Sequence, residues 1–296
     1  MLICDTHADT LWARSAGNAS PDVTLANLTA CKEDIRIQAL ALYVHTGGME
    51  EKPNVVEREL NTFAQMKAEG FHQIREVSEA QPGLANVMLT IEGGEAFGSD
   101  PANVEHFAQL GVRMAALTWN NENLIAHPAL SGSREGLTPF GRDVVRRMHH
   151  CRMAADVSHL NERGFWDLMD GPVCPMASHS CARRLCDHPR NLNDDQLRAL
   201  FAAGGFVGVN FYPTFLSEDS RADIDRIIDH MAYMCDLGGE DCVGLGSDFD
   251  GIELYPEGMR TAADVPRLID RLRERGFGSA TEKIAGLNFK RYMENL

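Results

Sequence analysis

The chain opens with a histidine and an aspartate whose spacing suits metal binding. His7 and Asp9 follow a short apolar run, residues 1–3. In an extended strand, side chains at positions i and i+2 point to the same face, so one imidazole nitrogen and one carboxylate oxygen would converge on a single point. A divalent metal of the zinc type accepts both donors. The pair would also fit a core histidine beside an aspartate that caps a helix, so this segment alone leaves both interpretations open.

Four more groups that bind metals or move protons follow other predicted strands. Glu92 precedes two glycines, which leave room above its carboxylate. A short apolar run precedes each of the others, which are His159, His179 and Asp248. Alone, each histidine could be structural, Glu92 could cap a helix and Asp248 could brace a turn. Six such groups at the ends of five strands nevertheless predict a metal site. His45, at the end of the second strand, either faces this site or belongs to a loop.

The elements that must position these groups alternate along the chain. Apolar or β-branched runs predict strands at residues 2–6, 37–44, 87–91, 112–117, 153–157, 173–177, 206–210 and 243–246. Segments of helical period predict helices at residues 55–69, 103–110, 141–150, 161–169, 194–203 and 224–237. Eight strands alternating with helices are typical of parallel βα units and favour an α/β fold, a (β/α)8 barrel of the TIM type. In such barrels the chemistry lies at the C-terminal ends of the strands, where the six groups stand.

An open, doubly wound sheet is the alternative fold. It would need a phosphate-binding glycine loop after the first strand, and His7-Ala8-Asp9 stands there instead. No linker rich in proline, glycine or serine divides the chain, and no internal repeat is evident. We therefore expect a single barrel domain with a metal site over residues 1–296.

The composition disfavours several classes of partner. The formal net charge of −15 argues against nucleic acid and anionic membrane surfaces. The eight cysteines show no C-x-x-C spacing, and we expect neither a secretory leader nor a disulfide framework. No run of about 18 apolar residues is present to span a bilayer. We expect a cytoplasmic protein with no nucleic-acid or membrane partner.

The segments that carry these groups, taken in order, resemble the membrane (renal) dipeptidase family of zinc metallopeptidases, peptidase family M19, whose barrel is amidohydrolase-like. The resemblance runs nearly from end to end of the chain. It rests on residues 5–9 (DTHAD), 91–94 (IEGG), 156–160 (DVSHL), 178–180 (SHS), 189–191 (PRN), 209–212 (VNFY), 246–251 (GSDFDG) and 286–289 (GLNF).

The resemblance implies a site for two Zn²⁺ ions. His7 and Asp9 would hold one ion. His159 and His179 would hold the second, and Glu92 would bridge both as part of the catalytic centre. Two neighbouring cations need such a carboxylate between them to offset their repulsion. Other divalent metals would also suit these donors.

The resemblance also implies how the substrate is held. Arg190 would clamp the substrate's terminal carboxylate, for which a guanidinium fork is the natural partner. Asp248 would contact the substrate and pass a proton from the attacking water to the leaving amine. These assignments make Glu92 and Asp248 the catalytic carboxylates.

The chain departs from the animal members of the family at the end of the fourth strand. Those enzymes carry a substrate-contacting histidine after Leu-Thr, whereas Trp119, Asn120 and Asn121 stand here. We expect Trp119 and Asn120 to lie against the substrate, and the polarising contact would come from an asparagine, from the metal alone or from no group. Residues 117–120 also contain no lysine, so the carbamylated-lysine bridge of many amidohydrolases is absent and Glu92 is the consistent alternative.

The implied activity is hydrolysis of dipeptides by a hydroxide that bridges the two ions, including dipeptides with a C-terminal D-amino acid. The alternative is an amidohydrolase that acts on another amide, a lactone or an N-acyl amino acid. A barrel kept only for binding or assembly is a third hypothesis, but it would have no physical reason to retain a complete ligand set. The resemblance also suggests a homodimer, without the lipid-anchor tail of the animal enzymes.

Overall fold

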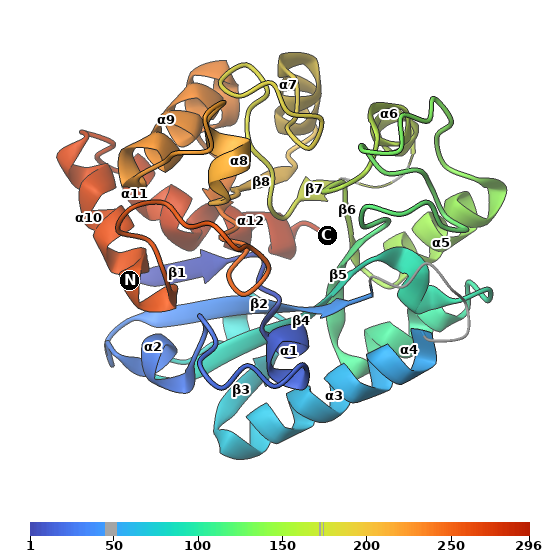
Figure 1. The fold of residues 1–296 in the computed structure, drawn as a ribbon, viewed down its shortest axis with the longest axis horizontal. Helices are drawn as coiled ribbons and strands as arrows, with labels where there is room; N and C mark the ends of the chain where they lie inside the picture. Colours follow the sequence, from blue (N-terminus) through green and yellow to red (C-terminus); the bar gives the residue numbers. More distant parts are fainter. Residues whose placement is uncertain (45–51, 172, 174) are drawn as a thin grey trace.

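Eight parallel strands close into a barrel, as the sequence predicts (Figure 1). The computed structural model describes residues 1–44, 52–171, 173 and 175–296, so His45 lies outside the described residues. β1 pairs with β9 through Asp5 and Leu245, which closes the ring. In order around the ring the strands are β1 (Leu2–Asp5), β2 (Ile35–Tyr43), β4 (Ala85–Glu92), β5 (Val112–Ala116), β6 (Ala154–Asp156), β7 (Met176–Ala177), β8 (Phe206–Val209) and β9 (Val243–Leu245).

The sequence does not predict the ninth strand, β3 (Phe71–Ile74), which lies outside the ring. β3 pairs with the first half of β4, from Ala85 to Met88. β5 pairs with the second half of β4, and the register shifts between Leu89 and Thr90. Only the two ends of β3 are buried, so its four residues lack the continuous apolar run that marks the barrel strands.

The helices surround the barrel (Figure 1). All six predicted helices are confirmed. Among the described residues, no helix is both long enough and apolar enough to cross a bilayer. The α-helices are α1 (Thr10–Ser15), α2 (Leu25–Thr29), α3 (Lys52–Glu69), α4 (Asn103–Leu110), α5 (Pro139–His150), α6 (Glu162–Met169), α7 (Asp194–Ala202), α8 (Pro213–Leu216), α9 (Ile224–Met234), α10 (Val265–Glu274), α11 (Ala280–Glu282) and α12 (Asn288–Glu294). Short 3₁₀ turns cover Val77–Glu79, Gly94–Phe97 and Ala262–Asp264, and π-helical turns cover Cys235–Gly239 and Lys283–Leu287.

The inside of the barrel changes from apolar to polar along the strands. At the N-terminal ends, side chains from the strands and from α12 form one buried apolar cluster that includes Cys4, Met88, Met114, Met176, Phe206, Phe289 and Tyr292. Because alternate residues of a strand share a face, the next inward positions lie two residues further along. Several of these are buried polar residues: Thr6, Thr90, Asp156 and Ser178. The apolar plug at one end and the polar layer above it leave the C-terminal end for chemistry.

A buried histidine fastens two loops at that end. His230, on α9, accepts a hydrogen bond at Nδ1 from the Ala182 backbone N–H (3.1 Å). Its Nε2 lies 3.0 Å from the Leu216 carbonyl oxygen and donates to it. Burial lowers the pKa of His230 from 6.5 to about 4. A second proton would break the bond to Ala182 and place a charge in an apolar position.

We therefore expect the free energy of unfolding to fall as the pH drops from about 6.5 to about 4. The folded-state pKa lies below that of the unfolded chain, so protons favour unfolding throughout this interval. The loss attributable to His230 should reach about 3 kcal/mol, at about 1.4 kcal/mol per pKa unit. Urea unfolding at pH 7.5, 5.5 and 4.5 measures it, and His230→Gln should show a flatter pH dependence. Parallel pH profiles for the two proteins would contradict this prediction.

Candidate active site

The predicted chemical groups meet at the C-terminal ends of the strands, and every one of them is buried. His7 and Asp9 follow β1, Glu92 ends β4, His159 follows β6, His179 follows β7 and Asp248 follows β9. Hydrogen bonds between strand ends hold this layer together. The Thr6 hydroxyl oxygen lies 2.6 Å from the Ser178 carbonyl oxygen and 2.9 Å from the Leu245 carbonyl oxygen, so its one proton is shared between them and links the end of β1 to the ends of β7 and β9.

The first group of side chains gathers around His7. Its Nε2 lies 3.6 Å from Asp9 Oδ2, 3.7 Å from Glu92 Oε2 and 3.7 Å from Asp248 Oδ1. The imidazole ring stacks on His179, with the ring centroids 3.8 Å apart. These contacts place one nitrogen donor among three carboxylates.

The second group contains two histidines whose tautomers are set by their neighbours. The Ser178 hydroxyl donates its only proton to Asp156 Oδ2. The Ser178 oxygen then accepts from His179 Nδ1, 2.7 Å away, which leaves a lone pair on His179 Nε2. His159 Nδ1 lies 2.8 Å from Asn120 Oδ1 and donates to it, so His159 Nε2 carries a lone pair as well. Such outer hydrogen bonds orient histidines that bind metals.

Both of these histidines are neutral. Burial, with the positive charge of Arg190, lowers the pKa of His159 to about 4. Burial and the charge on His7 hold the pKa of His179 well below its usual value. The two Nε2 atoms lie 3.0 Å apart, and they lie 2.8 and 3.4 Å from Glu92 Oε1. Two neutral lone pairs beside one carboxylate oxygen are a donor set for a cation.

Three carboxyl groups crowd around the one imidazole of His7. Burial raises the pKa of Asp9 to about 8, and the charge on Glu92 adds to this rise. Burial also raises the pKa of Asp248, against the opposing charge on His7. Burial alone would lower the pKa of His7, but the carboxylates of Glu92 and Asp9 hold it well above its usual value. Cations bound here would relieve this crowding of carboxylates.

Several buried atoms of the site also lack hydrogen-bond partners within the described part of the chain: His7 Nε2, Asp9 Oδ1 and Glu92 Oε2. Buried polar atoms normally have a partner, so these atoms indicate a missing one. Ligand atoms within 4.8 Å of one another form three sets: His7, Asp9 and Glu92; Glu92, His159 and His179; and His7, His179 and Asp248. The residues present fit a divalent metal centre in which Glu92 is shared.

The turn that carries Asp248 is held in an unusual conformation. Asp248 has a φ of +66°, in the left-handed region that favours glycine. Asn210 Nδ2 donates to Asp248 Oδ2 (2.8 Å), and this leaves Oδ1 on the side of His7. Position 251 requires glycine, because a Cβ there would lie 2.1 Å from Asp9 Oδ2 and 2.7 Å from Asp248 Oδ1. Close approach of the two carboxylates thus depends on glycine.

Asp250 fastens the same turn to the segment that carries Asp9. Its Oδ2 accepts from the Thr10 hydroxyl (2.6 Å), and its Oδ1 accepts from the Asp22 backbone N–H (2.7 Å). Asp22 Oδ2 in turn accepts from the Asp250 backbone N–H (3.0 Å). No sequence pattern predicts these contacts of Thr10, Asp22 and Asp250, although Asp250 belongs to the GSDFDG segment.

A cavity of about 440 Å³ opens at the site, and four of the six groups line it: Asp9, Glu92, His159 and Asp248. Arg190 borders it and is only 4% exposed. The guanidinium lies over the Phe215 ring, 5.4 Å from its centroid, and its Nε and Nη2 atoms have no hydrogen-bond partner among the described residues. A buried cation with unused donors beside a cavity is suited to bind an anionic group of a ligand.

Trp119 and Asn120, the residues expected to lie against the substrate, both line this cavity. Asn120 also orients His159, a contact that the sequence did not indicate. Aromatic residues that were not predicted as site residues line the cavity as well: Trp12, Tyr43, Tyr212 and Phe215. Tyr212 lies in the VNFY segment, but no local signal distinguishes Trp12 or Tyr43 from core residues.

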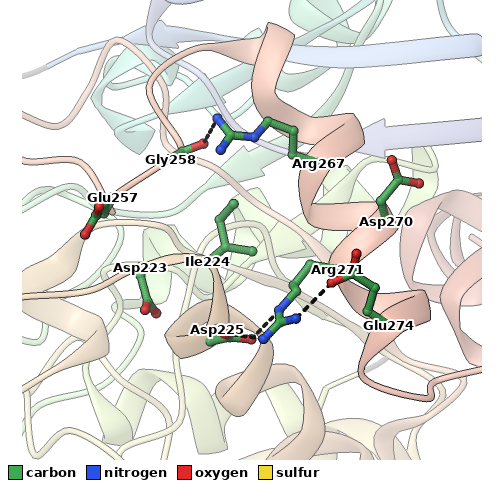
Figure 2. A pocket seen from close by; sticks show the side chains of 9 residues that line it. All are labelled: Asp223, Ile224, Asp225, Glu257, Gly258, Arg267, Asp270, Arg271 and Glu274. Atoms are coloured by element: carbon green, nitrogen blue, oxygen red, sulfur yellow. Dashed lines mark hydrogen bonds and ion pairs between the residues drawn. The ribbon is translucent and has the colours of Figure 1, made fainter.

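A larger hollow, of about 560 Å³, lies against α9 and α10 on the surface (Figure 2). Arg271 there donates to Asp225 (2.8 and 2.9 Å) and to Glu274 (2.8 Å). Arg267 donates to the Gly258 carbonyl oxygen (3.3 Å). None of the residues that line the hollow in the described structure is a histidine or a cysteine. Its charges join the two helices, and we assign it no catalytic role.

Comparison with known families gives one match over the whole chain. The model described as membrane dipeptidase (peptidase family M19) matches residues 1–296. An uncharacterized protein in the pqqA 5′ region of Klebsiella pneumoniae is 39% identical over 218 residues, which are 70% of this chain and 80% of that protein. An uncharacterized dipeptidase of Schizosaccharomyces pombe is 40% identical over 211 residues, which are 69% of this chain and 51% of that protein. The chain spans about half the length of the curated dipeptidases that it matches.

Two solved structures share the fold over nearly the full length. A metallo peptidase from Rhodobacter sphaeroides, liganded with a phosphinate mimic of the dipeptide L-Ala-D-Ala, has a TM-score of 0.88 and 25% identity, covering 99% of both chains. A metallo peptidase of family M19 named dipeptidase AC has a TM-score of 0.87 and 27% identity, covering 99% of this chain and 98% of that one.

Proposed function

Because the chain belongs to the membrane dipeptidase family, peptidase family M19, we propose that it is a zinc-dependent dipeptidase. The observation that carries this proposal is the pairing of two features in one cavity. At the base of the cavity lies a buried set of histidines and carboxylates that fits divalent cations. Arg190 borders the same cavity and is a buried cation with unused donors, which would bind the terminal carboxylate of a short peptide.

We assign the metal ligands by group. His7 and Asp9 would hold one Zn²⁺ ion and His159 and His179 the other, with Glu92 shared between them. When bound, divalent cations in such a site supply Lewis-acid polarisation of the scissile carbonyl and activation of the attacking water. Ser178 and Asn120 keep the two neutral imidazoles turned toward Glu92.

Asp248 would move the proton. Its Oδ2 is taken by Asn210, so Oδ1 is the atom free to accept a proton from the attacking water and to return it to the departing amine. Burial raises the pKa of Asp248, which brings the carboxyl closer to the range in which it both accepts and donates. Arg190 would hold the substrate so that its peptide bond lies over Glu92.

The substrates that we propose are dipeptides, including those with a C-terminal D-amino acid. The R. sphaeroides metallo peptidase was solved with a mimic of L-Ala-D-Ala, which supports this choice. An activity screen of the zinc-loaded protein tests it, with dipeptides of both stereochemistries beside N-acyl amino acids and lactones. Hydrolysis confined to the last two classes would reject the dipeptidase proposal in favour of another amidohydrolase.

The metal content can be measured without any assay of activity. We expect two divalent ions per chain in the fully zinc-loaded protein, because two ligand groups share Glu92. Glu92→Gln should lower the bound zinc, since it removes the charge that faces both groups. Elemental analysis gives the ratio, and Glu95→Gln, a buried glutamate of the next turn, is the control. A ratio of one or less, unchanged in Glu92→Gln, would reject the two-ion centre.

We further propose that residues 1–296 act as one hydrolase domain, in the cytoplasm and as a homodimer. The cysteines that the structure describes are all free thiols, which supports a reducing compartment. Light scattering of the purified protein would measure the oligomeric state.

A further inference from the structure

We infer that Trp12, Tyr43 and Trp119 form the subsite for the N-terminal residue of the dipeptide and select a large apolar side chain there. This inference rests on the proposed function and concerns its specificity. The three residues come from three different barrel connections: Trp12 lies on α1, Tyr43 ends β2 and Trp119 follows β5. All three border the cavity above the metal-binding groups.

The three rings make one continuous surface, here called the aromatic wall. The Trp12 and Tyr43 ring centroids lie 5.9 Å apart with an interplanar angle of 89°. Tyr43 and Trp119 lie 5.2 Å apart at 79°. Edge-to-face pairs at these separations stabilise each other and fix the orientation of the rings. The wall is therefore a preformed surface, and little side-chain entropy is lost when a ligand packs against it.

The order of the strands places this wall across the barrel from Arg190. Around the ring, three strands separate β2 from β7 in one direction and three in the other. Tyr43 ends β2, whereas Arg190 lies in the loop after β7. Trp12, after β1, and Trp119, after β5, extend the wall on the Tyr43 side. Glu92 ends β4, between the connections that carry Tyr43 and Trp119.

The two ends of a dipeptide must then face different surroundings. If Arg190 binds the terminal carboxylate, the C-terminal residue lies on the β7 side of the opening. The peptide bond lies over the metal-binding groups in the centre. The N-terminal residue is left on the opposite side, where the aromatic wall stands. Selection at this position is thus separate from recognition of the terminal carboxylate.

The chemistry of the wall favours an apolar side chain. Two of its members are indoles and the third is a phenol, so none of the three side chains carries a charge at neutral pH. Each additional methylene buried against such a surface strengthens binding by about fourfold. The acidic residues that line the cavity are Asp9, Glu92 and Asp248, which belong to the metal-binding groups, and Glu253, which is exposed to solvent and would interact only weakly with a cationic side chain.

The test is a series of dipeptides with one C-terminal residue and glycine, alanine, leucine, phenylalanine or lysine at the N-terminus. For the zinc-loaded enzyme we expect kcat/KM to be about 10- to 100-fold higher with leucine or phenylalanine than with alanine. Trp12→Ala and Trp119→Ala should each reduce this ratio several-fold while changing hydrolysis of Ala-Ala less. Trp166→Ala, which removes the remaining tryptophan on α6 outside the cavity, should leave the ratio unchanged.

The outcomes separate this inference from the proposed function. A flat profile in the unmodified enzyme, or a preference for lysine, would overturn the aromatic subsite and leave a dipeptidase. An apolar preference that survives both cavity substitutions would also overturn it. Failure to hydrolyse any dipeptide would overturn the proposed function itself.

Discussion

Replacing Asp248 with asparagine should lower kcat by about 10²–10⁴-fold, the range lost when a positioned acid–base group is removed. The asparagine side chain matches the carboxylate in size, and its amide oxygen can still accept from Asn210 Nδ2, which donates to Asp248 Oδ2 in the native chain (2.8 Å). The change therefore falls on the atom that faces His7, where an amide N–H cannot accept a proton. We expect the fold and the bound metal to persist.

Single-turnover kinetics and elemental analysis of Asp248→Asn, run side by side, measure the two parts of this prediction. Asp270→Asn is a matched control, because Asp270 lies on the surface of α10 and pairs only with Arg273 in the described structure. Turnover close to that of the unmodified enzyme would remove Asp248 from the mechanism. A loss of activity accompanied by loss of zinc would instead assign Asp248 to metal binding, beside His7 and His179.

The second large effect concerns Arg190. A dipeptide whose terminal carboxylate is converted to an amide should be a poor substrate, since it offers no charge to the guanidinium. Arg190→Ala should reduce kcat/KM for the free dipeptide by roughly 30-fold to several thousand-fold, from losses of about 2–5 kcal/mol for a buried charge left without its partner. The same substitution should affect the dipeptide amide much less, because that substrate forms no ion pair.

The measurement compares two enzymes on two substrates. Arg184→Ala provides the control, because Arg184 is an exposed arginine of the same loop. Arg190→Lys should recover only part of the activity, since an ammonium keeps the charge but not the planar fork. Equal losses on the dipeptide and its amide would show that Arg190 supports the loop rather than the substrate.

The barrel and the cluster at its end follow from local patterns in the chain. Each barrel strand is a short run buried on both faces, so the run itself reveals the strand; β4, with eight buried residues, is the clearest case. Parallel strands joined by helices bring all their C-terminal ends to one side. A histidine or carboxylate at the end of such a run, or just after it, therefore lies on the side of the barrel where the site forms. For this reason His7, Glu92 and His179 could be grouped from the sequence alone.

β3 and the shorter β7 show where such patterns stop being informative. β3 pairs only with the first half of β4, and the two central residues of its four are partly exposed. Its sequence therefore shows no continuous apolar run and resembles that of a loop. β7 contains two paired residues, although the run that predicts it is five residues long. Pairing partners, not the run itself, decide where a strand begins and ends.

The remaining features of the site arise between segments that are distant in the chain. His179 presents Nε2 to Glu92 because the Ser178 proton goes to Asp156, 22 residues away. The aromatic wall joins Trp12, Tyr43 and Trp119, whose spacing has no period. Sequence distance carries information about contacts only within an element or between successive ones, where backbone geometry repeats. Hydrogen-bond directions and ring contacts between separate loops depend on how the barrel packs those loops together. The sequence therefore determines which residue types can bind a metal. The orientation of those side chains and the shape of the substrate cavity are decided only by the folded structure, because they depend on contacts between distant segments.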